Sequence, residues 1–320
     1  MVLADPVERP GKPTRHTFAE PHLGTFVRLI FYSADARARA TAKKKADQCF
    51  RRVKTLDAIF SDYRDDSELT RLCQKPIKVP HKVSEELFEV ITFAQEASAQ
   101  SGGAFDITLG RDTKRWRDRR DGKTAAVHSG QQTQVSYRSL VLNPKKRTVF
   151  FQQPLQLDLG GIAKGYIADQ LLAHLKASGI KQTAVIIGGE IALGDAPPEK
   201  KGWRIGLSDP EQNIIGSLVL SNTALSTSGD SYQFFEKEDG ERRAHLIDPT
   251  SRQGKSNRLN VTTIAPTGMR ADAWATAFRI MPTGNAFTLA ERVEGIEALF
   301  IPLEGKRKAT GGFPALEKSK

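Results

Sequence analysis

Two glycines, Gly160 and Gly161, join an apolar segment ending near Asp158 to a predicted helix that carries Lys164 in its first turn. Glycine lets a ligand approach the backbone closely, and free N–H groups at a helix N-terminus favour phosphate. The glycine spacing fits neither a Walker A loop nor a dinucleotide-binding fingerprint, so a purely structural turn is an equally good interpretation. Asp158 favours a ligand site, because a carboxylate ending an apolar strand needs a partner such as a metal ion, a ribose or a ring N–H.

A second candidate is the carboxylate–hydroxyl pair of Asp272 and Thr276, four residues apart in an alanine-rich segment. On a helix this spacing puts both oxygens on one face, and the small neighbouring side chains leave space beside them. Carboxylate, hydroxyl and backbone carbonyl oxygens suit Mg²⁺ better than zinc. An aspartate favoured by the dipole of a helix first turn would give the same pattern, so the spacing alone does not decide between the two.

Three further segments carry polar groups in apolar surroundings. Residues 227–230 (Thr-Ser-Gly-Asp) could cap a helix or donate hydrogen bonds to a phosphate. His245 begins a short apolar stretch. A single histidine is more often structural than catalytic, but the nearby Asp248 brings the two interpretations closer to equal. The turn at 188–190 follows an apolar strand, and a structural role is the better interpretation of it.

The composition is that of a soluble globular protein with an excess of positive charge. The 320-residue chain has 48 Lys and Arg against 37 Asp and Glu, a formal net charge of +11, and 39% of its residues are hydrophobic. The basic residues form separate clusters without a nucleic-acid-binding motif, which favours a solvated surface and no nucleic-acid partner. Two cysteines exclude a disulfide framework and a four-thiolate zinc site. No apolar stretch reaches the ~20 residues that span a bilayer.

Alternating strand and helix patterns predict one α+β domain, in one or two lobes, that positions these groups. Apolar residues recur every three or four positions within 46–60, which predicts a helix, and Ser84 is expected to start a second one. Segment 111–136 is basic, and its apolar residues show neither helix nor strand spacing, so it is interpreted as an exposed excursion. The other expected elements are strands at 23–32, 155–159 and 183–188, a hairpin turning at 143–144, a helix at 163–178, several strands within 203–265, a helix at about 271–281, and a final helix and strand ending near 302.

Eight short segments between residues 23 and 276 carry a resemblance that none of them carries alone. They are Leu23-Gly24-Thr25, 60–64 (FSDYR) with 67–69 (SEL), 103–108 (GAFDIT), 158–166 (DLGGIAKGY), 187–190 (IGGE), 227–230 (TSGD), 245–249 (HLIDP) and 271–276 (ADAWAT). In this order they resemble the ApbE family, the FAD:protein FMN transferases. Each match is short, but eight ordered matches are highly specific.

The resemblance implies mixed or antiparallel sheets with packed helices, and an enzyme that uses FAD as substrate with Mg²⁺. It implies transfer of the FMN moiety to a Thr or Ser hydroxyl of an acceptor protein, with release of AMP. The implied Mg²⁺ ligands are Gly161 through its carbonyl, Asp272 and Thr276, and His245 is the expected general base or orienting residue. FAD contacts are implied for Leu23, Tyr63, Ala104, Phe105, Asp106, Asp158, Lys164 and Leu246.

Two departures from the family and three alternatives accompany this interpretation. Leu23 stands where the family usually has Met, and segment 250–254 is longer than its family counterpart and altered, beside the expected site. The same site would serve an FAD pyrophosphatase giving FMN and AMP, or a non-catalytic FAD-binding protein. A basic surface that binds nucleic acid ranks last.

The resemblance places the domain at residues 21–305, between a flexible N-terminal segment (1–20) and a basic C-terminal tail (306–320). Family members are commonly exported, often as lipoproteins, yet no signal peptide or lipobox is visible. We therefore expect an exported, periplasmic protein whose signal is missing from this chain, with a membrane-anchored full-length form left open.

Overall fold

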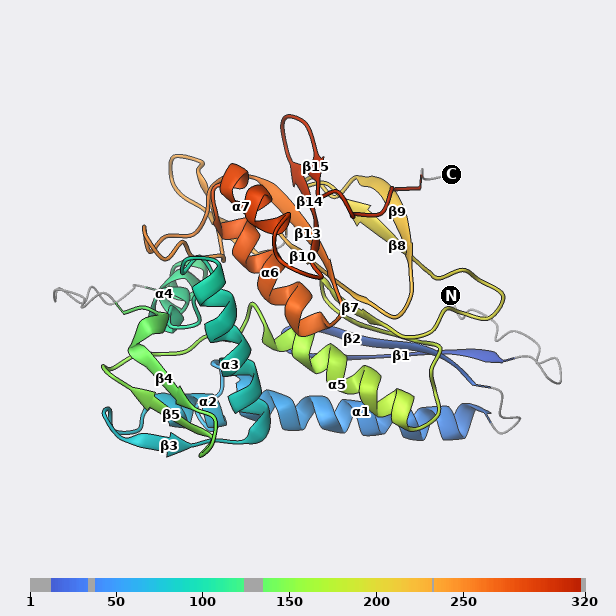
Figure 1. The fold of residues 1–320 in the computed structure, drawn as a ribbon, viewed down its shortest axis with the longest axis horizontal. Helices are drawn as coiled ribbons and strands as arrows, with labels where there is room; N and C mark the ends of the chain where they lie inside the picture. The colour runs from blue at the N-terminus through green and yellow to red at the C-terminus, as the bar shows by residue number, and fades with distance from the viewer. Residues whose placement is uncertain (1–12, 34–37, 124–134, 232, 318–320) are drawn as a thin grey trace.

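The computed structural model describes residues 13–33, 38–123, 135–231 and 233–317. Its centre is an antiparallel sheet in which the eight described strands follow the order β1-β2-β6-β7-β10-β13-β14-β15 (Figure 1). Most neighbours in this order are far apart in the chain, so long-range pairing builds the sheet. Its strands are β1 (Thr14–His22), β2 (Thr25–Ser33), β6 (Thr183–Ile187), β7 (Glu190–Leu193), β10 (Ala224–Ser228), β13 (Leu259–Ala265), β14 (Glu297–Pro302) and β15 (Lys308–Ala309).

Smaller sheets and the helices complete the described fold. The small sheets pair β3 (Pro80–Lys82), β5 (Thr148–Phe151) and β4 (Leu140–Asn143) in that order, β8 (Trp203–Ser208) with β9 (Ile214–Leu220), and β11 (Phe234–Glu236) with β12 (Arg242–Ala244). The helices are α1 (Ala38–Phe60), α2 (Glu68–Cys73), α3 (Glu85–Gln100), α4 (Gly110–Arg120), α5 (Ala163–Ala177), α6 (Gly268–Ile280) and α7 (Thr283–Ala290), with a short 3₁₀ turn at Tyr137–Ser139.

Both faces of the large sheet are covered. Helices α1, α5 and α6 lie against one face, and the β8–β9 hairpin lies on the opposite side (Figure 1). Successive strand residues point to opposite faces. Accordingly, Ala224 packs in the main core with the helices, whereas its neighbour Leu225 packs with Leu207 and Leu218 of the hairpin. This double burial explains why inner strands of the sheet such as β6 read as apolar runs.

Most of the predicted elements are confirmed, together with the single α+β domain. The periodic apolar residues of α1, from Ala46 to Phe60, are buried, and Ser84 caps α3 by accepting a hydrogen bond from the Leu87 N–H. The hairpin turning at 143–144 is β4–β5, and the expected late helices and last strand are α6, α7 and β14. No helix among the described residues is long and apolar enough to cross a membrane.

Three expectations differ from the structure. The strand expected at 155–159 is only an extended segment, whose Gln156 bridges Leu109; its neighbour Leu157 donates its N–H to the Cys73 thiol instead of to a strand. Strand β1 begins at Thr14, inside the segment assigned to a flexible N-terminus. In the assigned tail, β15 pairs with β14, and Glu317 exchanges backbone hydrogen bonds with Ser217.

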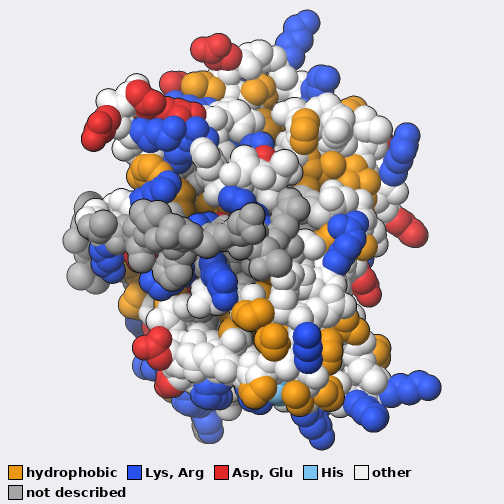
Figure 2. All heavy atoms as spheres, turned by 90° about the vertical axis from the view of Figure 1, so that its left-hand side faces the viewer, with side chains coloured by type: hydrophobic (Ala, Val, Ile, Leu, Met, Phe, Trp, Pro, Cys, Tyr) orange, Lys and Arg blue, Asp and Glu red, His pale blue; other side chains and the backbone are white. Residues whose placement is uncertain are grey.

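The exposed excursion predicted at 111–136 is wrong for its first third, because Gly110–Arg120 forms α4. Trp116 is buried on its inner face against Leu109 and Ile247. Residues 124–134 of this segment lie outside the described ranges. On the face that carries α4, Lys and Arg side chains are spread among uncoloured and apolar atoms and do not form one continuous patch (Figure 2).

Candidate active site

Three turns meet at one end of the large sheet. The β1–β2 turn has Leu23 and Gly24 in the left-handed region, with φ of 55° and 69°, and the β6–β7 turn has Gly188 at 62°. A Cβ on Gly188 would lie 3.5 Å from the Thr25 hydroxyl oxygen, which shows how closely the first two turns approach. The third turn follows β10, whose last residues reach the β6–β7 turn: the Thr227 N–H donates to the Gly189 carbonyl at 3.2 Å. Leu23 packs partly buried against the main core.

The crossing of α5 and α6 forms the floor of the site. A Cβ on Gly165 would lie 2.1 Å from the Gly268 carbonyl oxygen, so the two helix backbones touch where both residues are glycine. Asp272 is 1% exposed, and one of its oxygens, Oδ2, accepts the Gly165 N–H at 3.0 Å. Its other oxygen, Oδ1, is buried and has no hydrogen-bond partner. An unpaired buried carboxylate oxygen is costly, which makes Oδ1 a candidate ligand for a bound cation.

The predicted metal ligands lie together at this crossing. A Cβ on Gly161 would be 3.0 Å from the Thr276 hydroxyl oxygen, which is itself 3.3 Å from the Ser228 hydroxyl oxygen. Burial raises the pKa of Asp272, and the positive charge of Lys164 opposes that shift. Among the described residues, no three His, Cys, Asp or Glu side chains gather as a metal site. A cation here would therefore bind one carboxylate, neutral oxygens and oxygens brought by substrate or water, a set that suits Mg²⁺.

Lys164 is held beside the Asp272 carboxylate by Glu190, which was not among the predicted site residues. Its ammonium donates to the Gly160 carbonyl at 2.8 Å and lies 3.3 Å from Oε1 of Glu190. Burial alone would lower the pKa of Lys164, but the carboxylates of Glu190 and Asp272 outweigh it and raise that pKa. Burial raises the pKa of Glu190 to about 7, against the effect of Lys164. Lys164 thus keeps a fixed positive charge next to the glycine turn.

His245 is half-buried at a second corner of the site. Its Nδ1 lies 3.2 Å from the Gln233 carbonyl oxygen, and its ring meets the ring of Trp116 edge-on at 6.1 Å. A carbonyl only accepts, so Nδ1 carries the hydrogen and Nε2 keeps a lone pair. Burial lowers the pKa of His245 to about 4, and the charge of Lys164 adds to this shift. His245 is therefore neutral at physiological pH and can accept a proton at Nε2.

Asp158 and Tyr63 belong to a third group, on the side of α1 and α4. Oδ1 of Asp158 accepts the Gly160 N–H at 2.7 Å, which fixes the glycine turn. Burial and the nearby Asp158 raise the pKa of Asp62 to about 6, although the Arg117 guanidinium opposes the shift. Arg117 pairs with Asp62 and lies over the Tyr63 ring, and Tyr63 is 72% exposed. Arg117 was not among the predicted site residues, because it lies in the basic segment that was expected to be an exposed excursion.

The remaining predicted FAD contacts are engaged within the protein. The Asp106 carboxylate accepts hydrogen bonds from the N–H and hydroxyl of Thr108 and from the Tyr137 N–H, at 2.8, 2.7 and 2.9 Å. Phe105 is buried in the main core, beside the half-buried Ala104, and the Leu246 carbonyl accepts the Lys255 N–H at 3.0 Å. These interactions give each residue a structural role, and their contact with FAD stays a prediction.

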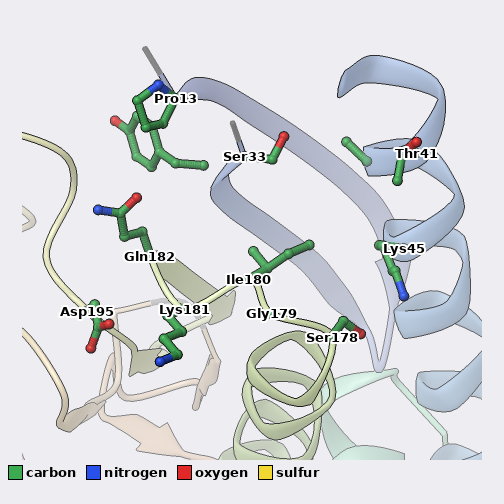
Figure 3. A pocket seen from close by; sticks show the side chains of 12 residues that line it. Pro13, Ser33, Thr41, Lys45, Ser178, Gly179, Ile180, Lys181, Gln182 and Asp195 are labelled. Atoms are coloured by element: carbon green, nitrogen blue, oxygen red, sulfur yellow. The ribbon is translucent and has the colours of Figure 1, made fainter. Parts of the chain in front are cut away.

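A hollow of about 480 Å³ lies elsewhere, at the other end of α5 (Figure 3). Gly179, Lys45 and Asp195 are among its lining residues, and no residue of the candidate site lines it. At 1.5 Å per helical residue, Lys164 and Ser178 are about 20 Å apart along α5. The hollow is therefore separate from the candidate site.

Comparison with known proteins gives a consistent result over most of the chain. The chain is 29% identical over 295 residues to the FAD:protein FMN transferase of Escherichia coli K12, which covers 88% of this chain and 83% of that protein. It is 32% identical over 316 residues to the FAD:protein FMN transferase of Treponema pallidum, with 92% and 86% covered.

Solved structures agree with this similarity. The flavin transferase ApbE from Vibrio cholerae superimposes with a TM-score of 0.81 at 26% identity, covering 94% of this chain and 99% of that one. The apo form of Pseudomonas stutzeri flavinyl transferase ApbE gives a TM-score of 0.81 at 28% identity, covering 93% and 95%. A family model described as the ApbE family matches residues 23–300, and this chain therefore belongs to the ApbE family.

Proposed function

We propose that this protein is an FAD:protein FMN transferase, which transfers the FMN moiety of FAD to a Thr or Ser hydroxyl of an acceptor protein and releases AMP. The observation that carries the proposal is the buried Asp272 carboxylate, whose Oδ1 has no partner, beside the fixed charge of Lys164. Relatives along most of the chain are named FAD:protein FMN transferase, which supports the same activity.

Mg²⁺ fits the oxygen atoms at the α5–α6 crossing. Asp272, Thr276 and the Gly161 carbonyl are the residues that would hold it, as the unpartnered Oδ1 and the short Gly161–Thr276 approach suggest. When bound, the ion supplies neutralisation of negative charge on the pyrophosphate oxygens. Lys164 contributes a second positive charge, which the Glu190 carboxylate keeps in place.

His245 is the residue that we assign to proton transfer in this reaction. The acceptor hydroxyl oxygen forms a bond to the FMN phosphorus, while the bond from that phosphorus to the oxygen of the AMP leaving group breaks. The hydroxyl proton passes to Nε2 of His245, which is free to accept it because Nδ1 faces the Gln233 carbonyl. A positioned base of this kind typically contributes ~10²–10⁴-fold to the rate.

A direct experiment combines the protein with FAD, Mg²⁺ and an acceptor domain that carries a flavinylation Thr, and measures the intact mass of the acceptor. We expect the acceptor to gain one FMN group. The Asp272→Asn variant keeps an oxygen for the Gly165 N–H but loses its charge, and we expect it to be at least ~10²-fold slower. The matched control is Asp118→Asn, a carboxylate on α4 that pairs with Lys114, and it should retain full activity.

Other outcomes would contradict the proposal in distinct ways. Free FMN and AMP beside an unmodified acceptor would identify an FAD pyrophosphatase. Intact FAD that stays bound would identify a binding protein without turnover. Export to the periplasm is also part of the proposal, and detecting the native protein only in a cytoplasmic fraction would contradict it.

A further inference from the structure

Arg117 is oriented differently from most of the basic residues on its helix. The side chains of Arg111, Lys114, Arg119 and Arg120 are exposed, whereas the Arg117 side chain is only 14% exposed. Its guanidinium lies 2.6 Å from a carboxylate oxygen of Asp62, a side chain that is 16% exposed. A charged group turned inward and paired in this way has a specific position, because desolvation is costly without a partner.

The same guanidinium covers one face of the Tyr63 ring. The central carbon of the Arg117 guanidinium lies 4.2 Å from the centroid of that ring, within the range of a cation–π contact. Tyr63 is nevertheless 72% exposed, so most of its surface stays open to solvent. An exposed aromatic ring held from one side is suited to stack against another flat group on its open side.

Two further observations link Arg117 and its neighbour Trp116 to the rest of the site. The negative charge of Asp158, which fixes the glycine turn, acts on both Asp62 and Arg117. The residue before Arg117, Trp116, meets the His245 ring and donates its indole N–H to the Arg243 carbonyl at 3.1 Å. Adjacent residues of α4 thus reach two separate parts of the site.

We propose that Arg117 is a positioning residue for FAD. Through its ion pair with Asp62 and its contact with Tyr63, it holds the Tyr63 ring in one orientation, ready to stack on an aromatic ring of the dinucleotide. The inference rests on the proposed function, because it takes FAD as the ligand. Arg117 acts through Tyr63 and not on the reacting phosphorus, so its loss should weaken FAD binding and leave the rate at saturating FAD nearly unchanged.

The test is a double-mutant cycle on the full chain, with FAD binding measured by flavin fluorescence in the absence of Mg²⁺. We expect Arg117→Ala to weaken FAD binding about 3–10-fold, the effect of losing one partly exposed cation–π contact and its orienting ion pair. Arg119→Ala, an exposed arginine two residues along the same helix, should bind like the wild type. In a Tyr63→Leu background, Arg117→Ala should add no further loss.

Equal losses in the Tyr63 and Tyr63→Leu backgrounds would overturn the inference, since Arg117 would then act on the ligand without Tyr63. Unchanged binding in Arg117→Ala would also overturn it. Arg117→Lys, which keeps the charge but not the planar group, provides a milder variant if Arg117→Ala does not fold, and should bind with intermediate affinity.

A second measurement separates this inference from the proposed function. With the Tyr63 ring labelled for NMR, the ligand-free wild type and Arg119→Ala should give matching ring signals, and Arg117→Ala should give shifted or averaged ones. If the wild type bound no FAD, the proposed function would fail, and this ring signal would still decide whether Arg117 holds Tyr63. Identical ring signals in all three proteins would overturn the holding role.

Discussion

The two sides of the candidate site are built in different ways. At the α5–α6 crossing, Gly165 and Gly268 bring two backbones into contact, and Asp272 is fixed by a backbone N–H inside the main core. On the α4 side, Tyr63 and Arg117 meet through side-chain contacts near the surface. We therefore expect the crossing to separate only when the whole domain unfolds, whereas the contacts of the α4 side depend on fewer buried groups.

The polar contacts of the α4 side extend to the loop that follows His245. Asp112, 5% exposed, accepts hydrogen bonds from Arg115 and, at 2.8 Å, from Arg252 of the loop. Arg252 has a φ of 56°, and its guanidinium also donates to the Val135 carbonyl. This is the segment that departs from the family pattern, and here an ion pair attaches it to α4.

The largest effect is expected at the helix crossing. In Gly165→Ala the new methyl group would lie 2.1 Å from the Gly268 carbonyl oxygen and 2.8 Å from the Asp272 Cβ, so α5 and α6 must separate. We expect a loss of about 3 kcal/mol in the free energy of unfolding, measured in urea. Gly284→Ala on α7 has open space around its Cβ and should be neutral or stabilising by ~0.5–1 kcal/mol. Similar stabilities for the two variants would contradict the close packing.

A smaller effect is expected where the loop meets α4. Arg252→Ala leaves the buried Asp112 with Arg115 as its guanidinium partner, and should cost about 1–2 kcal/mol in unfolding free energy. The backbone strain at position 252 is unchanged, since alanine also has a Cβ. Lys114→Ala breaks only an exposed ion pair on the same helix, with Asp118, and should cost less than ~0.5 kcal/mol. Equal costs would show that the loop is not held by this contact.

A pH dependence is expected at His245. Its pKa is about 4 in the folded protein, against an ordinary value near 6.5. Between these values the unfolded chain binds the proton and the folded protein does not, so this contribution to stability is complete above pH 6.5 and is lost as the pH falls toward 4. From pH 7 to 5 the wild type should therefore lose more stability than His245→Asn. An imidazole NMR titration of His245 centred near 6.5 in the free protein would contradict this.

The sequence predicts the core elements because their signals are local. Helix α1 follows from apolar residues at helical spacing, and α3 from a serine cap and two terminal glycines. Helix α4 has only one strongly apolar inward residue, Trp116. Its other inward side chains, Asp112 and Arg117, are charged and are stabilised by Arg252 and Asp62, which lie 140 and 55 residues away. Pairing over such distances leaves no periodic signal.

The same reason limits what could be predicted of the site. The glycine turn and the Asp272–Thr276 spacing are local patterns, and the structure brings Gly161 close to Thr276. That they bind a cation stays a prediction. The role of Glu190 depends on its ion pair with Lys164, which belongs to another element. The sequence around Glu190 therefore predicted only a structural turn. The available signals were an acidic residue two glycines after a buried strand and its place in the family-like segment 187–190.

Cation binding at the crossing is tested most directly by titrating the free protein with Mn²⁺, a paramagnetic substitute for Mg²⁺, and following the unbound ion by EPR. We predict one site that Mg²⁺ displaces, at least ~10-fold weaker in Asp272→Asn because the only carboxylate of the set loses its charge. Asp62→Asn, on the α4 side, should bind Mn²⁺ like the wild type. Equal Mn²⁺ affinity in the wild type and Asp272→Asn would contradict a cation site at the α5–α6 crossing.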